Sequence, residues 1–386
     1  MGSDDIELVE CTTPQQRDEF IFFQWVPYKG NPYWVPPLIS ERREFYDKTK
    51  HPFHQHADVA MFLAKRGGQT VGTIYAIDNR AHNEFQHENI GMFGGFECLN
   101  DQAVAHALFE RVAHWLTARG RSALRGPLNF STNEECGLLI DAFDDEPRVM
   151  MTYNPPYYRD LIEREGFTKA KDLFAYRLEV KAGAGLDQLP AKLKRIMEKT
   201  LARSGIVIRN LDVKHLNEEI DRVVPVYDNA WSKNWGFVPM TQAEFRHLAQ
   251  SMKDVMDPDL LFVVEAKGEP IGVGWTMPDL CEPLRRAYAR PGTPEWWTVL
   301  KFMYYYKVRK TARYIRVLIL GVKEGYRVSG IDALLMAKTA EAAMKKGYAL
   351  GEFSWILEDN GPMRKGIEGM GGTIYKTYRL FEKALG

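Results

Sequence analysis

The stretch Leu318–Leu335, LILGVKEGYRVSGIDALL, has the most informative pattern in the chain. An apolar run typical of a buried strand ends at Gly321 and Val322, and apolar residues at helical spacing begin near Gly330. The first N–H groups of a helix have no partner within it, and the helix dipole adds partial positive charge there. Glycine lets the backbone approach a ligand closely. The stretch therefore predicts a strand, a glycine turn and a helix start that suits a pyrophosphate.

The rest of the chain predicts the same order of elements twice, each time a hairpin, a strand, a helix and a further strand. The Gly-, Ala- and Pro-rich residues 181–190 separate the halves. We therefore expect an α/β fold with two domains, residues 1–182 and 183–386. The predicted strands are 6–10, 58–66, 69–78, 90–99, 122–130, 206–210, 259–268, 269–278, 314–322 and 351–360, and the main helices are 14–23, 101–119, 191–203, one ending near 231 and one ending near 346.

The glycine turn resembles the pyrophosphate loop of the GNAT acyltransferase superfamily, Val-x-x-x-Tyr-Arg/Gln-x-x-Gly-x-Gly/Ala. Val322, Tyr326, Arg327 and Gly330 stand at four of those positions. Asn360, followed by Gly371, resembles the element that closes the GNAT fold. The resemblance implies two tandem GNAT-like domains, each a mixed twisted sheet flanked by helices, and acyl-CoA as the acyl donor without a metal.

The resemblance also implies roles for the residues of the loop. The backbone of the strand end would pair with the pantetheine arm, and N–H groups of the loop would hold the pyrophosphate. The cofactor-binding residues implied in this way are Leu320, Gly321, Val322, Tyr326, Arg327, Ser329, Gly330, Ile331 and Asn360.

Two positions depart from the family pattern. Asp332 replaces the last small residue of the loop, and a carboxylate near a phosphate is unfavourable, so Asp332 is expected to point away and cap the first helical turn. Ile367 stands where the family has the tyrosine that protonates the thiolate. Tyr378 is the candidate replacement, and Tyr375 is the alternative.

The first half has no such loop, because its helix follows Asp101 directly. Its closing segment, Thr152–Phe167, still resembles a GNAT ending, so this half is expected to hold the acceptor or complete the cleft. Paired carboxylates suit a general base, which makes Glu135 the first candidate and Glu134 the second. Candidate acceptor-binding residues, at predicted strand ends and on an aromatic loop, are Asn133, Tyr153, Asn154, Trp231, Asn234 and Trp235. Solvated carboxylates, turn residues and interdomain packing are the structural alternatives for these positions.

Composition narrows the class of protein. The 386 residues hold 51 Lys plus Arg and 51 Asp plus Glu, a balance that argues against a nucleic-acid partner. The four cysteines lie far apart, and His51, His54 and His56 have no second ligand group near them, which argues against a metal site.

The acidic start and the lack of a long apolar run favour a cytoplasmic protein without an integral membrane segment. Residues 296–306 are expected to form a core helix, with a peripheral lipid contact as the alternative.

These observations predict an N-acyltransferase in which a small-molecule or lipid-like amine attacks an acyl-CoA thioester directly. Two alternatives stay open at this point. One is an aminoacyl-tRNA-dependent transferase, as in some tandem GNAT relatives, and the other is a non-catalytic GNAT-fold protein that binds a thioester or a lipid. The acyl length, the acceptor and the oligomeric state do not follow from the sequence.

Overall fold

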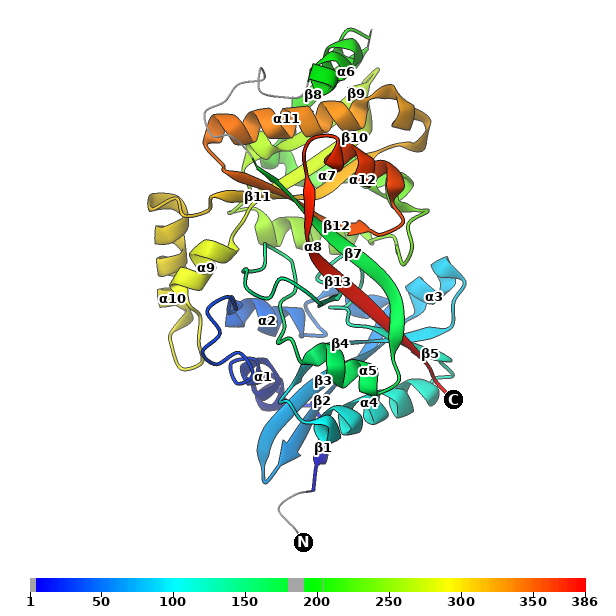
Figure 1. The fold of residues 1–386 in the computed structure, drawn as a ribbon, viewed down its shortest axis with the longest axis vertical. Coiled ribbons are helices and arrows are strands. Elements are labelled where there is room, and N and C mark those ends of the chain that lie inside the picture. Colours follow the sequence, from blue (N-terminus) through cyan, green and yellow to red (C-terminus); the bar gives the residue numbers. More distant parts are fainter. Residues whose placement is uncertain (1–4, 180–190, 204) are drawn as a thin grey trace. The chain divides into compact units, whose positions relative to one another are not determined.

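The computed structural model describes residues 5–179, 191–203 and 205–386 (Figure 1). Its chain forms two compact units, neither of which is contiguous in sequence. Unit 1 contains Met1–Leu173, Cys281–Arg309 and Lys376–Gly386, and unit 2 contains Phe174–Leu280 and Lys310–Tyr375. The predicted domain boundary between residues 182 and 183 lies outside the described residues.

Unit 1 is built on a mixed sheet with the strand order β1-β2-β3-β4-β5-β13-β7. Neighbouring strands from β1 to β4 are antiparallel, whereas β4 and β5 are parallel. Strands β7 and β13 each pass from one unit into the other. The elements of unit 1 are β1 (Glu7–Glu10), α1 (Pro14–Phe23), α2 (Ile39–Phe45), η1 (Pro52–Gln55), β2 (Ala57–Arg66), β3 (Gln69–Asn79), α3 (Arg80–Gln86), β4 (Ile90–Cys98), α4 (Gln102–Thr117), β5 (Ala123–Gly126), β6 (Leu138–Leu139), α5 (Tyr158–Arg164), α9 (Cys281–Ala287), α10 (Glu295–Met303), η5 (Tyr304–Val308) and parts of β7 (Thr168–Glu179) and β13 (Thr373–Ala384).

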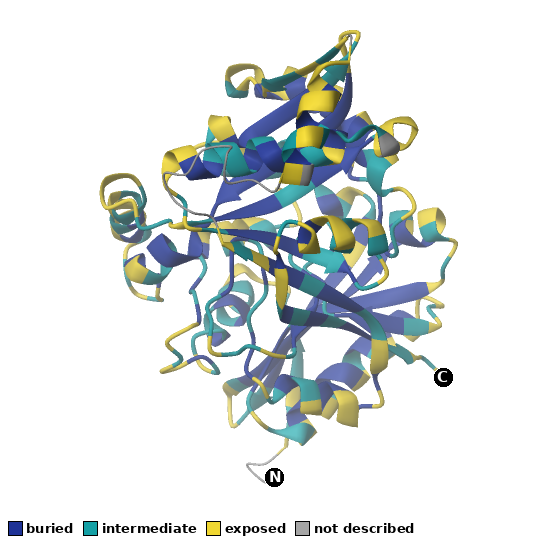
Figure 2. Cartoon of the chain, turned by 45° about the horizontal axis from the view of Figure 1, so that its top comes forward, coloured by how far each residue is buried: buried dark blue, intermediate teal, exposed yellow. Residues whose placement is uncertain are grey.

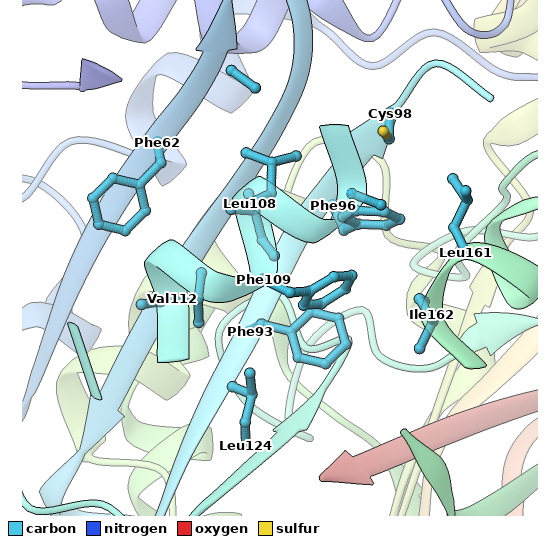
Figure 3. Close-up of a cluster of buried hydrophobic side chains, with 14 of the residues drawn as sticks. Phe62, Phe93, Phe96, Cys98, Leu108, Phe109, Val112, Leu124, Leu161 and Ile162 are labelled. Carbon is cyan, nitrogen blue, oxygen red and sulfur yellow. The ribbon is translucent and has the colours of Figure 1, made fainter. Parts of the chain in front are cut away.

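Helices cover both faces of the unit 1 sheet. Helix α4 packs Leu108 and Phe109 against the strands, in a core that also contains Phe93 and Phe96 (Figure 3). On the opposite face, Phe20 of α1 stacks with Tyr75 of β3. Strand β3 thus fills two packing layers, because Ile74 and Ala76 belong to the core under α4 while Tyr75 between them contacts α1.

Unit 2 repeats this plan with the strand order β7-β12-β11-β10-β9-β8. Only β11 and β12 form a parallel pair among the ladders described for this unit. Its elements are α6 (Ala191–Leu201), β8 (Ile206–Asn210), η3 (Val213–His215), α7 (Leu216–Trp231), α8 (Gln242–Met252), η4 (Pro258–Leu260), β9 (Leu261–Ala266), β10 (Glu269–Pro278), β11 (Tyr314–Val322), η6 (Glu324–Ser329), α11 (Ile331–Lys346), β12 (Leu350–Leu357) and α12 (Gly361–Glu368), with the remaining parts of β7 and β13.

The two faces of the unit 2 sheet are covered by different helices. Leu335 of α11 lies over Gly272 and Gly274 of β10, where a larger residue than glycine would collide with it or touch it. On the other face, Phe245 of α8 packs edge-on against Trp275 of β10. The α/β architecture expected from the sequence is confirmed.

Three local expectations differ from the structure. The strand expected over 122–130 ends at Gly126, because a proline follows and the chain bends away. The strand expected over 351–360 ends at Leu357. Residues 296–306 do form helix, but Trp296 is 64% exposed and Leu300 55%, so the expected core helix is wrong.

A buried carboxylate lies at the end of β4. Glu97 accepts hydrogen bonds from the hydroxyls of Tyr158, at 2.7 Å, and Tyr28, at 3.2 Å, and all three residues are buried. Burial raises the pKa of Glu97 from 4.5 to about 8, against the lowering influence of the two tyrosine hydrogen bonds. The folded chain therefore keeps a proton on Glu97 at pH values where the unfolded chain has lost it.

This difference in protonation predicts a pH dependence of stability. Between about pH 4.5 and pH 8 the folded state binds one proton more than the unfolded state, so the free energy of unfolding falls as pH rises, by a few kcal/mol in order of magnitude. Glu97→Gln should remove this loss of stability. At about pH 8.5 the variant should therefore unfold at a higher urea concentration than the wild type, whereas at about pH 5.5 it should not. Glu110→Gln, on the exposed side of α4, is the control. Parallel pH profiles for Glu97→Gln and the wild type would contradict the prediction.

Candidate active site

The loop singled out by the sequence joins β11 to α11 in unit 2. After Val322 the chain forms η6, and Gly330 then turns into α11 with a positive φ of 81°. A side chain at Gly330 would bring its Cβ within 2.7 Å of Ile196 Cγ2 and 2.8 Å of Thr200 Oγ1. Glycine is thus required here both by backbone conformation and by the close approach of α6.

A cavity of about 330 Å³ opens where α11 begins. Three cationic side chains line it, Lys199 from α6, Arg203 just after α6 and Arg327 from η6, together with one carboxylate, that of Asp332. The dipole of α11 adds partial positive charge at this helix start, and no side chain caps its first turn in the described structure. The full lining is Ile196, Lys199, Thr200, Arg203, Arg327, Ser329, Gly330 and Asp332. This composition suits a phosphate or pyrophosphate group.

Hydrogen bonds from two helices hold the loop in place. Thr200 Oγ1 of α6 donates to the Ser329 carbonyl at 3.1 Å, and Arg203 Nη1, just after that helix, donates to the same oxygen at 2.7 Å. At the end of α7, the Ala230 carbonyl accepts from Arg327 Nη2 at 2.7 Å. The loop is therefore positioned before any ligand arrives, which lowers the entropic cost of binding.

Helix α6 contributes half of this cavity, and the sequence prediction did not include it. Lys199 lies in the last turn of α6, and Arg203 lies two residues beyond its end. Nothing in the local sequence connects these two cations with a loop 130 residues away. The expectation for Asp332 was wrong, because its exposed carboxylate lines the cavity and no cap is formed.

The pairing of β11 with β12 ends before the residues that were predicted to hold pantetheine. The parallel ladder runs from Tyr314↔Leu350 to Val317↔Phe353. On its other side β11 stays paired with β10, with an extra residue, Leu318, opposite the Trp275–Thr276 step. Such a bulge re-aims a strand and ends pairing. Within the described ladders, the predicted pantetheine-binding residues Leu320, Gly321 and Val322 lie beyond the last β11–β12 rung.

A buried polar cluster lies at the last rungs of that ladder, on the face opposite Val317 and Phe353. Arg316 Nε donates to Ser354 Oγ at 2.7 Å and lies 3.8 Å from Glu352 Oε1. The hydroxyls of Ser354 and Tyr375 both donate to the Glu352 carboxylate. Glu352 is 1% exposed, whereas Tyr375 is only half-buried. A carboxylate joined to an accessible phenol is an arrangement that can pass a proton.

Two of the predicted acid–base residues, Tyr378 and Glu135, make structural contacts. Tyr378 is 1% exposed, its backbone pairs with Leu139, and its Cβ lies against Gly137 in unit 1. Glu135 in unit 1 accepts from Arg42 Nη2 at 2.9 Å and from Asn129 Nδ2 at 2.9 Å. These contacts occupy the Glu135 carboxylate, whose role as a base stays a prediction.

The other candidates of unit 1 have structural contacts. Glu134 Oε1 lies 3.2 Å from His51 Nε2, and the Asn133 N–H donates to Ser131 Oγ. Asn154 is buried and joins the backbone of Leu139 through both ends of its amide. Tyr153 donates to the Phe143 carbonyl at 2.8 Å. Each of these contacts orders a loop, and none of them tests acceptor binding.

The aromatic loop of unit 2 lies next to the predicted pantetheine strand. The ring of Trp231 covers Gly321, where an added Cβ would come within 2.1 Å of it. The Trp231 carbonyl accepts from the N–H of Asn234 at 2.8 Å, which starts the turn that also contains Trp235.

Asn360, predicted to contact the cofactor, caps α12 by accepting from the Met363 N–H at 3.3 Å.

The corresponding helix start in unit 1 is closed by its own side chain. Asp101 Oδ1 accepts from the N–H groups of Ala103, at 2.9 Å, and Val104, at 3.4 Å. Arg66 Nη1 pairs with the other carboxylate oxygen at 2.8 Å. A negative charge already occupies the place that an anion would take. The same topology thus offers an anion site in unit 2 and fills it internally in unit 1.

Comparison with solved structures identifies the fold. The tandem GNAT protein from the clavulanic acid biosynthesis pathway matches with a TM-score of 0.58 at 11% identity, over 99% of both chains. A GCN5-related N-acetyltransferase from Sphaerobacter thermophilus matches with a TM-score of 0.53 at 13% identity, over 98% of this chain and 96% of that one. The fold is therefore that of a tandem GNAT protein. No model of a known protein family matches the sequence.

Two sequence relatives cover nearly the whole chain. Bacterial ceramide synthase from Caulobacter vibrioides is 36% identical over 99% of this chain and 98% of its own length. Protein YghO from Escherichia coli K12 is 33% identical over 95% of this chain and 92% of its own. The chain therefore belongs to the family that contains these two proteins.

Two further findings on the described residues concern membrane-spanning helices and groups of metal ligands. None of the described helices combines the length and the apolar character needed to cross a bilayer. No group of three or more His, Cys, Asp or Glu side chains in the described part of the chain is placed to hold a metal ion.

The cavity yields a prediction for ligand binding. Arg327→Glu places a carboxylate among the groups that would face a phosphate, and it should weaken coenzyme A binding about tenfold or more in calorimetry. Lys199→Glu should act in the same direction, since this cation comes from α6. Lys253→Glu, an exposed charge reversal away from the cavity lining, is the matched control. Equal affinities for all four proteins would remove the phosphate assignment.

Proposed function

We propose that the protein is an N-acyltransferase that moves an acyl group from acyl-CoA to the amino group of a lipid-like amine. The observation that carries the donor half of this proposal is the cavity at the uncapped start of α11, with its three cations and one carboxylate. The loop that borders it contains the residues predicted to hold a pyrophosphate. A coenzyme A thioester joins such a diphosphate to a flexible arm that suits the β11 edge.

The acceptor half of the proposal rests on the relatives. A ceramide is an amide between a fatty acid and a long-chain amino alcohol. One relative that spans nearly this whole chain is named bacterial ceramide synthase. We therefore infer that the acceptor is a long-chain amine of this kind, and we propose the cytoplasm as the place of reaction.

The proposed reaction is a direct acyl transfer. The amine nitrogen attacks the thioester carbonyl carbon, the carbon–sulfur bond breaks, the amine loses a proton and the thiolate gains one. An N–H group of the β11 edge would donate to the carbonyl oxygen as negative charge develops on it. No covalent bond to the protein is required.

Proton transfer in this reaction is assigned to the buried cluster. Tyr375 is half-buried, and its hydroxyl donates to Glu352. Arg316 and Ser354 fix the carboxylate from its other side. Tyr375 would turn its one hydroxyl proton from Glu352 to the thiolate, and Glu352 would hold the phenol in place before this transfer as a positioning residue. Glu135 and Glu134 remain the proposed bases for the amine.

The central experiment combines the purified protein with a long-chain acyl-CoA and sphinganine. Thiol release and the mass of the amide product should appear together, and both should require the amine. Binding of coenzyme A without turnover of any amine would instead identify a thioester-binding protein that does not catalyse. Failure to bind coenzyme A, combined with binding of aminoacyl-tRNA, would identify the other alternative.

The acid assignment yields a separate prediction. Tyr375→Phe keeps the ring but loses the hydroxyl, so kcat should fall about a hundredfold while KM for acyl-CoA changes little. Tyr378→Phe is the matched control, because this tyrosine is buried in unit 1. A large loss of kcat in Tyr378→Phe with none in Tyr375→Phe would reverse the assignment.

The predicted base is tested in the same assay. Glu135→Gln retains the shape of the side chain and its contact with Asn129 but removes the charge that pairs with Arg42. Turnover should fall at least tenfold, and coenzyme A affinity should stay unchanged. Circular dichroism and unfolding in urea separate this effect from a loss of folding. Full activity would remove Glu135 from candidacy.

A further inference from the structure

The segment from α10 through η5 exposes an apolar surface that belongs neither to the cavity nor to the polar cluster. Trp296, Leu300, Tyr304 and Val308 follow one another at intervals of four residues, and they are 64%, 55%, 48% and 68% exposed. This spacing places them along one side of the segment. Trp297 and Val299, at 49% and 38%, widen the surface. We call these six residues the α10 patch; the segment is the helix labelled α10 in Figure 1, and exposed residues are yellow in Figure 2.

The opposite side of the same segment packs in the ordinary way. Thr298 and Phe302 are buried, and Phe302 stacks with Tyr306 at 5.8 Å. Lys301 Nζ donates to the Ala287 carbonyl, and Glu295 accepts from both the N–H and the hydroxyl of Ser40. The segment is therefore fixed to unit 1 with its apolar patch turned outward. Large exposed apolar patches on ordered helices mark interaction surfaces.

The charge of the segment indicates the kind of partner. Residues 296–310 contain four cations, Lys301, Lys307, Arg309 and Lys310, and no Asp or Glu, although the whole chain is balanced at 51 of each sign. Lys307, Arg309 and Lys310 are exposed at the end of the patch. Tryptophan and tyrosine favour the interface of a bilayer, where the ring is apolar and the N–H or O–H stays hydrated. Nearby cations add attraction to anionic headgroups.

We propose that the α10 patch is a docking surface for the interface of an anionic lipid bilayer. The helix lies in the plane of the interface, with Trp296, Leu300 and Tyr304 at the level of the headgroups and upper acyl chains. Lys307 and Arg309 contact anionic headgroups. The proposal stands on the exposed patch and its charge, and it holds whether or not the protein acylates an amine.

Vesicle binding tests this proposal on the full-length protein. Vesicles of phosphatidylcholine are compared with vesicles in which about a third of the lipid is phosphatidylglycerol, and bound protein is measured by co-sedimentation. The wild type should bind the anionic vesicles. Trp296→Ser combined with Leu300→Ser should weaken that binding about tenfold or more, because two anchors are lost. Lys307→Glu combined with Arg309→Glu should abolish the preference for phosphatidylglycerol.

The controls distinguish a membrane surface from an interface between two copies of the chain. Val207→Ser removes an apolar residue of similar exposure, 54%, from β8 and should leave vesicle binding unchanged. Coenzyme A affinity of every variant should equal that of the wild type, which separates this result from failure of the proposed reaction. The proposal is overturned if the wild type binds neither kind of vesicle, or if the double serine variant binds as the wild type does. It is also overturned if that variant only converts a dimer into a monomer in sedimentation velocity.

Discussion

A left-handed glycine, Gly330, joins η6 to α11, and its missing side chain lets α6 come within contact distance of the turn. This close approach lets Thr200 and Arg203 reach the Ser329 carbonyl, and it brings Lys199 to the same cavity. The cationic lining, the direction of the α11 dipole and the fixed loop all depend on that one contact. A larger residue would have to displace α6 and would separate two of the three cations from the helix start.

The two units show how one topology serves two purposes. In unit 1 the helix after the central strand begins with Asp101, which neutralises its own first turn. In unit 2 the corresponding helix begins at Gly330, without a side-chain cap, and a cavity lies at its start. The buried polar groups are also distributed differently. Unit 1 buries Glu97 between two tyrosines, whereas unit 2 places Glu352 beside a half-buried phenol.

Local patterns predicted most of the elements, and tertiary contacts decided the rest. The bounds of α1, β8 and β11 agree with the sequence prediction residue for residue, because each is a short periodic run between turn-forming residues. The loop at Gly330 followed from its motif. The contribution of Lys199 and the joining of Arg316, Glu352 and Tyr375 depend on the pairing of distant segments, which one sequence does not encode locally. The apolar run that begins at Trp296 correctly predicted a helix, but it did not predict which side of that helix is exposed.

The strand β13 has a consequence for how the chain acquires its structure during synthesis. Its residues 381–384 pair with β5, and Phe381 is wholly buried in the unit 1 core, although β5 was made some 250 residues earlier. A ribosome therefore exposes the N-terminal strands long before their last neighbour exists. Until then β5 presents an open edge that can recruit other chains. Because this edge stays open during synthesis, we expect chaperones to bind the nascent first half early.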